Sequence, residues 1–489
     1  ERYGIESIDD LTSISPGTYT ASFYGVAGAL NIRGTLAENY FRGFKRIENR
    51  GTYSTPIANA AQIEIVRGPP TPIYGAGKVG GMLNFVPKSG RMEGEYISEI
   101  SGEADITVGS YARKEISGQI AIPLNFGTTE GGLSLYAQAE NSDSFYRGIS
   151  PRREIIQASV DFDLGGGWRT AFGGMAFHSD GDVQTPGWNR LTQDLIDNQT
   201  YITGRDTSLS DSNGDGKLTP NEIGFYPYAS AMYLAYYGFP QSDAKHTLDT
   251  GVGTTKLDPR TVYISDADFS NTWTRTGYVD LIKDFDNGSA LKFQLFYDEL
   301  KNKRFVSYGY PALFDSQVGE ARVTYDFDYD MGMVTSKSFV GASYRAFDGR
   351  RRESFNSGLI ALDRRDIAFG ATPTDIIDDP FSPETYGLQW ENDNSTTWSQ
   401  AGVFLTSDIF IGERLNLMLG GRYDNYEVES EDTGLVSYQP AGKFEDSQGK
   451  GTYTVSATYQ FDFGLMPYIT YAESSALEMS QAGDIAPGL

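Results

Sequence analysis

The chain contains no cysteine and only two histidines, His178 and His246. Without cysteine it can hold no disulfide framework, no thiolate metal site and no cysteine nucleophile. A Ser-His-Asp or zinc-dependent active site is poorly supported as well, because such sites gather several of these side chains at one place. The composition therefore predicts that the protein is not an enzyme.

Basic residues are scarce relative to acidic ones. The 489 residues include 40 Lys and Arg against 65 Asp and Glu, which gives a formal net charge of −25 and a sequence pI near 4.5. Nucleic-acid binding needs a basic surface, so we expect no nucleic-acid partner. An acidic surface favours cations or basic partner surfaces, although it also serves solubility alone.

Long apolar runs are missing too. No stretch reaches the roughly 20 apolar residues that a membrane helix needs, and the mean hydropathy is −0.39. A transmembrane β-barrel escapes this test, because only every second residue of its strands faces lipid. The chain opens with ERYGIESIDD, which has neither the basic start nor the apolar stretch of a secretory signal. If the protein is exported, we expect a processed or incomplete form.

Apolar and polar residues alternate repeatedly from residue 93 onward. In 452–463, tyrosine, valine, alanine and phenylalanine alternate with threonine, serine, glutamine and aspartate. The segments 414–424 and 290–298 show the same period. A period of two predicts half-buried strands, and we expect about 13 of them.

The connections between these strands come in two lengths. Short turns at 165–167, 286–288 and 411–413 alternate with long polar stretches, the longest of which is 179–270. Short turns at one end and long, extracellular loops at the other are typical of an outer-membrane barrel. We therefore predict an all-β transmembrane barrel. The alternative is a soluble β-sandwich or propeller, but sandwich turns recur every 8 to 12 residues or so without this asymmetry.

Residues 1–92 follow a different pattern. The segments 63–66 and 82–86 read as two short strands. Between them, a Gly-Pro-Pro turn and several glycines provide tight turns and close backbone approach. These features predict a compact αβ or β module.

The stretch IEIVRGPPTPIYGAGKVGGMLNFVPK, residues 63–88, resembles the plug-domain signature of TonB-dependent outer-membrane receptors. The earlier NIRG, residues 31–34, resembles an Arg-Gly element of the same plug. The matching positions are Arg33, Gly34, Ile63, Glu64, Val66, Arg67, Gly68, Pro69, Tyr74, Gly75, Gly77, Gly80, Gly81, Asn84 and Lys88.

The resemblance implies a protein of the Gram-negative outer membrane. An αβ plug domain, residues 1–92, is expected inside a β-barrel, residues 93–489. The family's barrel has 22 strands, so about 13 strands imply a chain that is incomplete at both ends, and no TonB box is recognisable. The implied partners are periplasmic TonB, outer-membrane lipid and a small-molecule substrate. By analogy, TonB adds as a strand to the plug's N-terminal segment and drives active import.

Plug arginines commonly meet barrel carboxylates in this family, since a buried unpaired charge is costly. Arg33 and Arg67 match the positions of those arginines. The resemblance implies lumen-facing partners such as Asp161, Asp298 or Asp424.

One segment departs from the family pattern. The family usually has a Tyr-x-Asp-Gly turn after the Arg-Gly element, but here Tyr40 is followed by Phe-Arg-Gly in a basic stretch. This part of the plug approaches the substrate in the family, so Tyr40 and Arg42 are candidate substrate contacts. The cations Arg42, Lys45 and Arg46 favour an anionic ferric siderophore, whereas the overall negative charge disfavours one.

The longest loop contains DSNGDGKLTPNE at 211–222, which matches the ligand spacing of an EF-hand calcium loop in full. Oxygen ligands at this spacing suit Ca²⁺. We expect an isolated loop that orders the long extracellular stretch, because the preceding TYITGRDTSLS has poor helical character. The alternative is an accidental match in an acidic surface loop. The candidate ligands are Asp211, Asn213, Asp215, Lys217 through its carbonyl, Thr219 through water, and Glu222.

Tyrosines cluster directly after this loop, in residues 223–240. Clustered aromatic rings favour either a binding platform for a sugar, aryl or siderophore ligand or packing between loops. A ferric siderophore is the expected substrate. Import of a glycan or another organic molecule, and a calcium-dependent surface structural or adhesion protein, are the alternatives. The candidate substrate residues here are Tyr226, Tyr228, Tyr236 and Tyr237.

Overall fold

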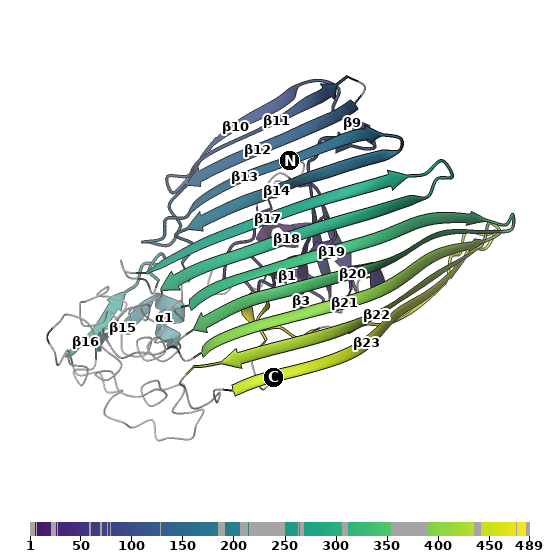
Figure 1. The fold of residues 1–489 in the computed structure, drawn as a ribbon. Coiled ribbons are helices and arrows are strands. Elements are labelled where there is room, and N and C mark those ends of the chain that lie inside the picture. Colours follow the sequence, from purple (N-terminus) through teal and green to yellow (C-terminus); the bar gives the residue numbers. More distant parts are fainter. Residues whose placement is uncertain are drawn as a thin grey trace.

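The fold is a broad curved sheet with a smaller group of strands inside its curve (Figure 1). It is seen in a computed structural model, which describes residues 5, 7–20, 26, 28–57, 60–68, 71–75, 77–78, 80–127, 129–183, 191–205, 214, 250–262, 264, 268–305, 312–353, 390, 392–434, 442–475 and 477–485.

Thirteen strands form the large sheet, and each is antiparallel to the next. This confirms the predicted number of strands and their up-and-down order. The strands are β10 (Ser101–Val108), β11 (Lys114–Phe126), β12 (Thr129–Asn141), β13 (Arg152–Gly165), β14 (Trp168–Asp180), β17 (Phe269–Asp284), β18 (Ala290–Phe305), β19 (Ala312–Asp330), β20 (Val334–Glu353), β21 (Asn392–Ile411), β22 (Leu415–Asp432), β23 (Gly442–Tyr459) and β24 (Tyr468–Glu473).

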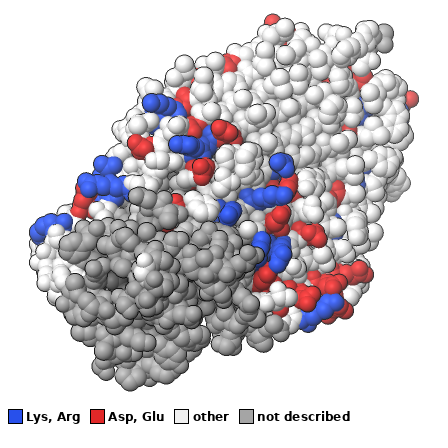
Figure 2. Space-filling model, turned by 60° about the vertical axis from the view of Figure 1, so that its left-hand side comes forward, with Lys and Arg blue, Asp and Glu red and all other residues white. Residues whose placement is uncertain are grey.

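Side chains alternate between the two faces of this sheet. In β22, Leu419 is exposed on the outer face, whereas Arg422 and Asp424 are buried on the inner face. The register places Leu419 opposite Val455, so apolar residues of neighbouring strands form a continuous outer belt. In Figure 2, charged side chains gather beside the grey region, and the wall farther away is mostly white. This apolar belt is the lipid-facing surface of an outer-membrane barrel.

Tyrosines mark one border of the apolar belt. Tyr344, Tyr423 and Tyr453 are exposed on the outer face of β20, β22 and β23. Beyond Tyr423 on the same face of β22 come Glu427 and Glu429. Aromatic rings at the border, with charges beyond them, match the interfacial girdle of such barrels.

The connections have the predicted asymmetry, but the longest one contains regular structure. Between β14 and β17 lie α1 (Gln193–Asn198) and a hairpin of β15 (Thr200–Arg205) and β16 (Thr250–Lys256). The hydroxyl of Thr192 accepts a hydrogen bond from the Leu195 N–H at 3.1 Å and so caps the start of α1. These elements are too short for their periodicity to stand out in the sequence.

The residues before β10 form the plug. Its main sheet has the order β5–β4–β7–β6, in which only β4 and β7 are parallel. β6 and β7 are the two strands predicted at 63–66 and 82–86. The plug elements are η1 (Asp9–Ser13), β1 (Thr18–Thr20), β2 (Leu30–Ile32), β3 (Thr35–Leu36), β4 (Glu38–Phe41), β5 (Phe44–Lys45), β6 (Ala60–Arg67), η2 (Pro72–Tyr74), β7 (Gly81–Pro87), β8 (Arg91–Met92) and β9 (Glu95–Tyr96).

Strands and 3-10 turns therefore make up the plug's regular structure, and its described residues contain no α-helix, unlike the αβ plug that was predicted. Its core continues into the barrel wall, where Phe41 and Phe85 join one buried cluster with Tyr278 of β17 and Phe296 of β18. Within the described part of the chain, no helix has the length and apolar character of a membrane span.

Candidate functional site

The glycine-rich signature shapes the turn between β6 and β7. The Gly68 N–H donates to the Gly80 carbonyl at 3.0 Å and closes the turn. A Cβ atom at Gly80 would lie 1.7 Å from the Thr35 hydroxyl, so only glycine fits there. Tyr74 and Gly75 follow within the same turn, and Tyr74 packs edge-on against Tyr40 with ring centroids 5.5 Å apart.

The two signature arginines do not reach the barrel carboxylates. Arg33 has a positive φ of 52°, Gly34 follows it at 87°, and the Arg33 side chain is exposed. Arg67 donates to the Ser15 hydroxyl at 3.1 Å, which keeps it within the plug. The expectation that Arg33 and Arg67 pair with lumenal acids is therefore wrong for this structure.

The three barrel acids that were expected to pair with Arg33 and Arg67 have other partners. Asp161 accepts a hydrogen bond from the Gly90 N–H at 2.8 Å. Asp424 pairs at 2.7 Å with Arg422, which belongs to the same strand. Asp298 does meet a plug arginine, but that arginine is Arg46, from the basic stretch that departs from the family pattern.

Among the described residues, the Arg46–Asp298 contact is the most deeply buried ion pair between plug and wall. Its Nη2 to Oδ1 distance is 3.0 Å, and the side chains are 6% and 3% exposed. Asp298 also accepts from the Ile47 N–H at 3.1 Å and from the Thr276 hydroxyl at 2.7 Å. One barrel carboxylate thus holds both the side chain and the backbone of the plug.

A second group of contacts lies around β5. Arg42 pairs with Asp280 at 2.5 Å and lies over the Tyr278 ring at 4.0 Å. Phe44 stacks on Phe296 with ring centroids 5.1 Å apart. Arg322 lies 4.2 Å above Phe44, so a barrel cation covers the ring that the plug inserts into the wall.

The plug segment 46–55 follows these contacts along the chain. It meets the wall near the long connection after β14, on the side predicted to be extracellular. Ser54 donates to Asp182 at 2.6 Å, and Arg153 pairs with Asp182 at 2.9 Å. Burial alone would raise the pKa of Asp182, but Arg153 and the Ser179 and Ser54 hydroxyls outweigh it and lower the pKa. Burial, with the nearby Asp298 charge, raises the pKa of the Tyr53 hydroxyl well above its usual value.

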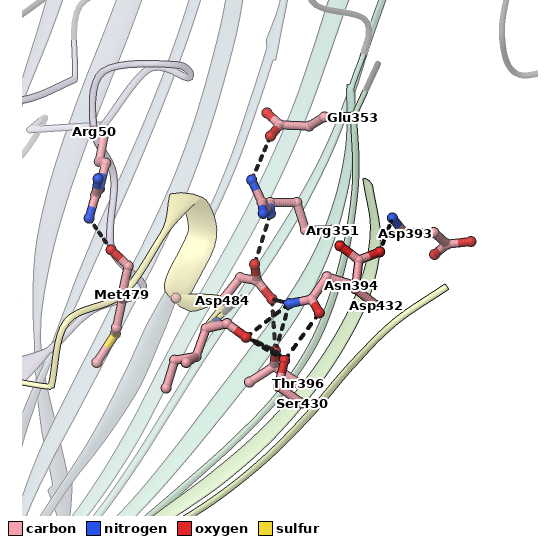
Figure 3. A network of polar contacts seen from close by, with 12 residues as sticks. Arg50, Arg351, Glu353, Asp393, Asn394, Thr396, Ser430, Asp432, Met479 and Asp484 are labelled. Carbon is pink, nitrogen blue, oxygen red and sulfur yellow. Dashed lines mark hydrogen bonds and ion pairs between the residues drawn. The ribbon is translucent and has the colours of Figure 1, made fainter. Parts of the chain in front are cut away.

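A segment beyond β24 also enters the lumen (Figure 3). Residues 477–485 include the 3-10 turn η5 (Gln481–Gly483). They lie against the lumenal face of β20, β21 and β22, near the strand ends that border the long connections. Asp484 pairs with Arg351 at 2.8 Å and accepts from Thr396 at 2.7 Å and from Asn394. Trp398 donates to the Gly483 carbonyl at 3.2 Å.

The same segment contacts the plug. Arg50 donates to the Met479 carbonyl and pairs with Glu478 at 3.0 Å. The Thr52 hydroxyl donates to the Gln481 side chain at 3.2 Å. Residues 477–485, called the lumen strap below, therefore bridge the plug and the wall. Sequence reasoning missed the strap, because SSALEMSQAGDIAPGL shows neither a strand period nor a motif.

The predicted substrate residues fall in two places. Tyr40 is 0% exposed within the plug, and Arg42 is held against Asp280, so neither reaches the extracellular side in this arrangement. Their role in substrate contact stays a prediction. The calcium-ligand candidates at 211–222, the tyrosines at 226–237 and Pro69 lie outside the described residues.

A strand-rich plug held inside a curved wall with an apolar outer belt defines a plugged β-barrel of the outer membrane. Comparison with family models agrees. The plug-domain model of TonB-dependent receptors matches residues 1–82, and the TonB-dependent receptor-like β-barrel model matches residues 206–487. The second match covers more than half of the chain, so the chain belongs to the TonB-dependent receptor family. This family comprises outer-membrane receptors and transporters of Gram-negative bacteria and is not a class of enzymes.

Solved structures show the same fold. The siderophore receptor PiuA from Acinetobacter baumannii is 18% identical with a TM-score of 0.67, over 96% of this chain and 62% of that one. The ferripyoverdine receptor of Pseudomonas aeruginosa is 15% identical with a TM-score of 0.66, over 96% and 55%. The ferric-catecholate import receptor Fiu of Escherichia coli is 15% identical with a TM-score of 0.64, over 97% and 68%. The chain thus spans less than two thirds of the length of two of these three receptors. A comparison with curated proteins found no match.

Proposed function

We propose that this protein imports a scarce nutrient across the outer membrane in a TonB-dependent cycle, and that the nutrient is a ferric siderophore. The observation that carries the proposal is the plug, which a passive pore would not need. Arg46, Arg42 and Ser54 join the plug to the barrel wall through polar contacts that water can replace when the plug moves. The likeness to solved siderophore receptors supports the choice of cargo.

The proposed cycle needs no covalent chemistry. Substrate binds between the extracellular loops and the plug, and TonB then binds the plug's N-terminal segment from the periplasm by adding a strand. Force on that segment remodels the plug and opens a path along the wall. The tyrosines Tyr226, Tyr228, Tyr236 and Tyr237 are proposed to supply an aromatic surface for the incoming ligand.

Uptake measurements test this proposal. Cells that lack other siderophore receptors would express the protein and receive ⁵⁵Fe with siderophores from iron-starved culture medium. Uptake should require both the protein and TonB, and the protein itself should rise in abundance on iron starvation. Uptake of carbohydrate instead of iron would favour glycan import, and no TonB-dependent uptake of any solute would overturn the proposal.

Removal of the plug gives an independent test of the architecture. Deletion of residues 1–92 should leave an open lumen and make the cells sensitive to large antibiotics such as vancomycin. The variant with an intact plug is the matched control. Unchanged permeability would show that the plug is not what closes the barrel.

We also propose that residues 211–222 bind Ca²⁺ and order the long extracellular connection. The support is the ligand spacing, from Asp211 to the expected bidentate Glu222. Glu222→Gln should lower the affinity for ⁴⁵Ca²⁺ strongly, whereas Asn221→Gln, beside it but outside the ligand set, should not. Equal affinities in both variants would remove the calcium proposal.

A further inference from the structure

The turn at the centre of the plug signature fits into a notch in the barrel wall. The turn is η2 (Pro72–Tyr74), which lies against β21, β22 and β23, and its Pro72 is buried. A Cβ atom at Gly420 of β22 would lie 2.9 Å from Pro72 Cγ and 3.1 Å from its Cδ, so glycine leaves room for the proline ring. Thr406 of β21, the cross-strand neighbour of Gly420, borders the same space. The wall therefore has a space free of side chains where the plug inserts a ring.

Gly75, the residue after η2, lies against wall side chains. It has a positive φ of 79°, and a Cβ atom there would lie 3.2 Å from Gln400 Nε2 and 3.6 Å from Arg422 Cζ. The plug backbone therefore passes close to the Arg422 guanidinium. A Cβ atom at Gly402 would lie 2.2 Å from Asp424 Oδ1 and 2.4 Å from Arg422 Nη2. A second wall glycine thus leaves the space in which Arg422 lies.

The charged groups of this region are satisfied within the wall. Arg422 and Asp424 are 3% and 0% exposed and pair at 2.7 Å. Arg422 also donates to the Ser343 hydroxyl at 2.8 Å, and Gln400 donates to Asp424 at 2.9 Å. The wall ion pair therefore needs no counter-ion from the plug, and the plug fits here by shape. The wall surface that receives the turn, formed by Gly402, Thr406, Gly420 and Arg422, is called the signature notch below.

Three of the plug's contacts with the wall lie on well-separated strands. The signature notch belongs to β21 and β22, and the Arg46–Asp298 pair joins the plug to β18. At the end of the plug, the Gly90 N–H donates to Asp161 of β13 at 2.8 Å, and a Cβ atom at Gly90 would lie 1.9 Å from the Gly132 carbonyl oxygen of β12. The strands β4 to β7 form one sheet, so contacts at three separated places fix both its position and its rotation in the lumen.

We propose that the signature notch is a docking site for the plug's own signature turn, and that Pro72, Gly75 and Gly420 are positioning residues for closure of the barrel. The turn enters the notch in one orientation, because the proline ring fits over Gly420 while the Gly75 backbone fits beside Arg422. That orientation turns the rest of the plug so that Arg46 reaches Asp298. The inference concerns how the lumen is closed, and it stands whatever solute the protein imports.

Filling the notch tests this role. The chain has no cysteine, so a single Ala37→Cys in the buried plug core reports opening of the plug through its rate of reaction with maleimide in the purified protein. Gly420→Val should raise this rate about 10-fold or more, because the added side chain occupies the place of the proline ring. Gly421→Val is the matched control, since a Cβ atom there meets no atom within 4 Å, and should change the rate about twofold or less. Equal effects of the two substitutions would overturn the inference.

A combination with Asp298→Ala separates positioning of the plug from local damage to the wall. Three strands lie between β18 and β22, which at ~4.8 Å per strand places the two sites roughly 19 Å apart. The effects of independent sites at such a distance multiply in the labelling rate. Because the notch brings Arg46 to Asp298, Gly420→Val should raise the rate by no more than about threefold once Asp298 is replaced. A full multiplicative effect in the double variant would show that the notch does not position this pair.

A milder pair of variants keeps the inference testable if Gly420→Val assembles poorly. Gly420→Ala adds one methyl group, and Pro72→Gly in the same chain removes the ring that this methyl group would meet. The labelling rate of the Ala37→Cys thiol should rise with Gly420→Ala and fall again, by about threefold or more, in the double variant. Cells that express these variants should show the same order in their sensitivity to vancomycin. A labelling rate that does not fall when Pro72→Gly is added would overturn the assignment of the notch.

Discussion

Asp298 is the residue whose removal should loosen the plug most. Its carboxylate accepts from Arg46, the Ile47 N–H and the Thr276 hydroxyl, and it is 2% exposed. Asp298→Ala leaves the Arg46 guanidinium buried without a counter-ion, and breaking a buried pair on one side costs about 3–5 kcal/mol. At about 1.4 kcal/mol per factor of ten, the opening equilibrium of the plug should rise roughly 100- to 4,000-fold.

A single thiol can report this opening, since the chain has no cysteine of its own. Ala37 is buried in the plug core, so Ala37→Cys should react with maleimide only when the plug opens. The labelling rate should therefore increase by about two to three orders of magnitude on Asp298→Ala. An increase below about fivefold, which corresponds to about 1 kcal/mol, would refute the reasoning that this pair anchors the plug.

Two comparisons separate this effect from general damage. Asp393→Ala removes an exposed ion pair, for which about 0–1 kcal/mol is expected, and should barely change the labelling rate. Combining Arg46→Met with Asp298→Leu replaces the pair by apolar side chains. This double variant should recover part of the lost free energy, because neither buried charge is then left alone, although the Ile47 N–H and the Thr276 hydroxyl lose their acceptor.

Three further predictions concern other contacts of the plug. Gly80→Val should destabilise the plug by about 1–3 kcal/mol or more, since a Cβ would meet the Thr35 hydroxyl at 1.7 Å. Thermal unfolding measures the effect, and Gly421→Val, at a wall position with no atom within 4 Å of the added Cβ and no positive φ, is the control. Phe44→Ala should cost about 3–5 kcal/mol through loss of its stack on Phe296, and Phe44→Leu, measured by the same unfolding curves, should cost less. The pKa of Asp182 is lowered in the folded protein. The stabilisation that its carboxylate gives is therefore fully present above the pKa of the unfolded chain, about 4, and is lost as the pH falls through the pKa of the folded protein. Hydrogen exchange of residues 48–55, corrected for intrinsic rate, should therefore rise at acid pH, and Asp182→Asn should abolish that dependence.

The strands of the barrel wall could be predicted from the sequence because the alternation of apolar and polar residues is a local pattern. In β22 every second residue from Leu415 to Tyr423 is apolar or glycine and faces outward, and a shift by one residue would turn charged side chains such as Arg422 into the lipid. The plug strands around 63–66 and 82–86 were predictable for a similar reason, since glycine and proline delimit them. Short elements such as α1 left too little periodicity to be recognised.

The partners of the plug could not be predicted in this way. Arg46 and Asp298 are separated by 252 positions, and their meeting depends on how the plug is rotated within the wall. The family pattern pointed to Arg33 and Arg67, but a positive φ turns the backbone at Arg33, and Ser15 takes the hydrogen bond of Arg67. The basic residues at 42–46, where the sequence differs from the family pattern, were the signal that could have identified these partners. Cations buried inside a lumen need acids opposite them.

The nature of these contacts explains how a plug can be both firmly placed and movable. Well-packed apolar residues often hold two buried elements about as well as an ion pair does, because two charges lose much of their hydration when they pair inside a protein. An ion pair differs because its favourable interaction energy requires one particular distance and orientation of the two charged groups. The pair therefore fixes the position of the plug. Once the plug shifts and water enters, hydration stabilises both partners separately. Force applied at the plug's N-terminal segment therefore has to break only the first contacts, after which water stabilises the groups that separate.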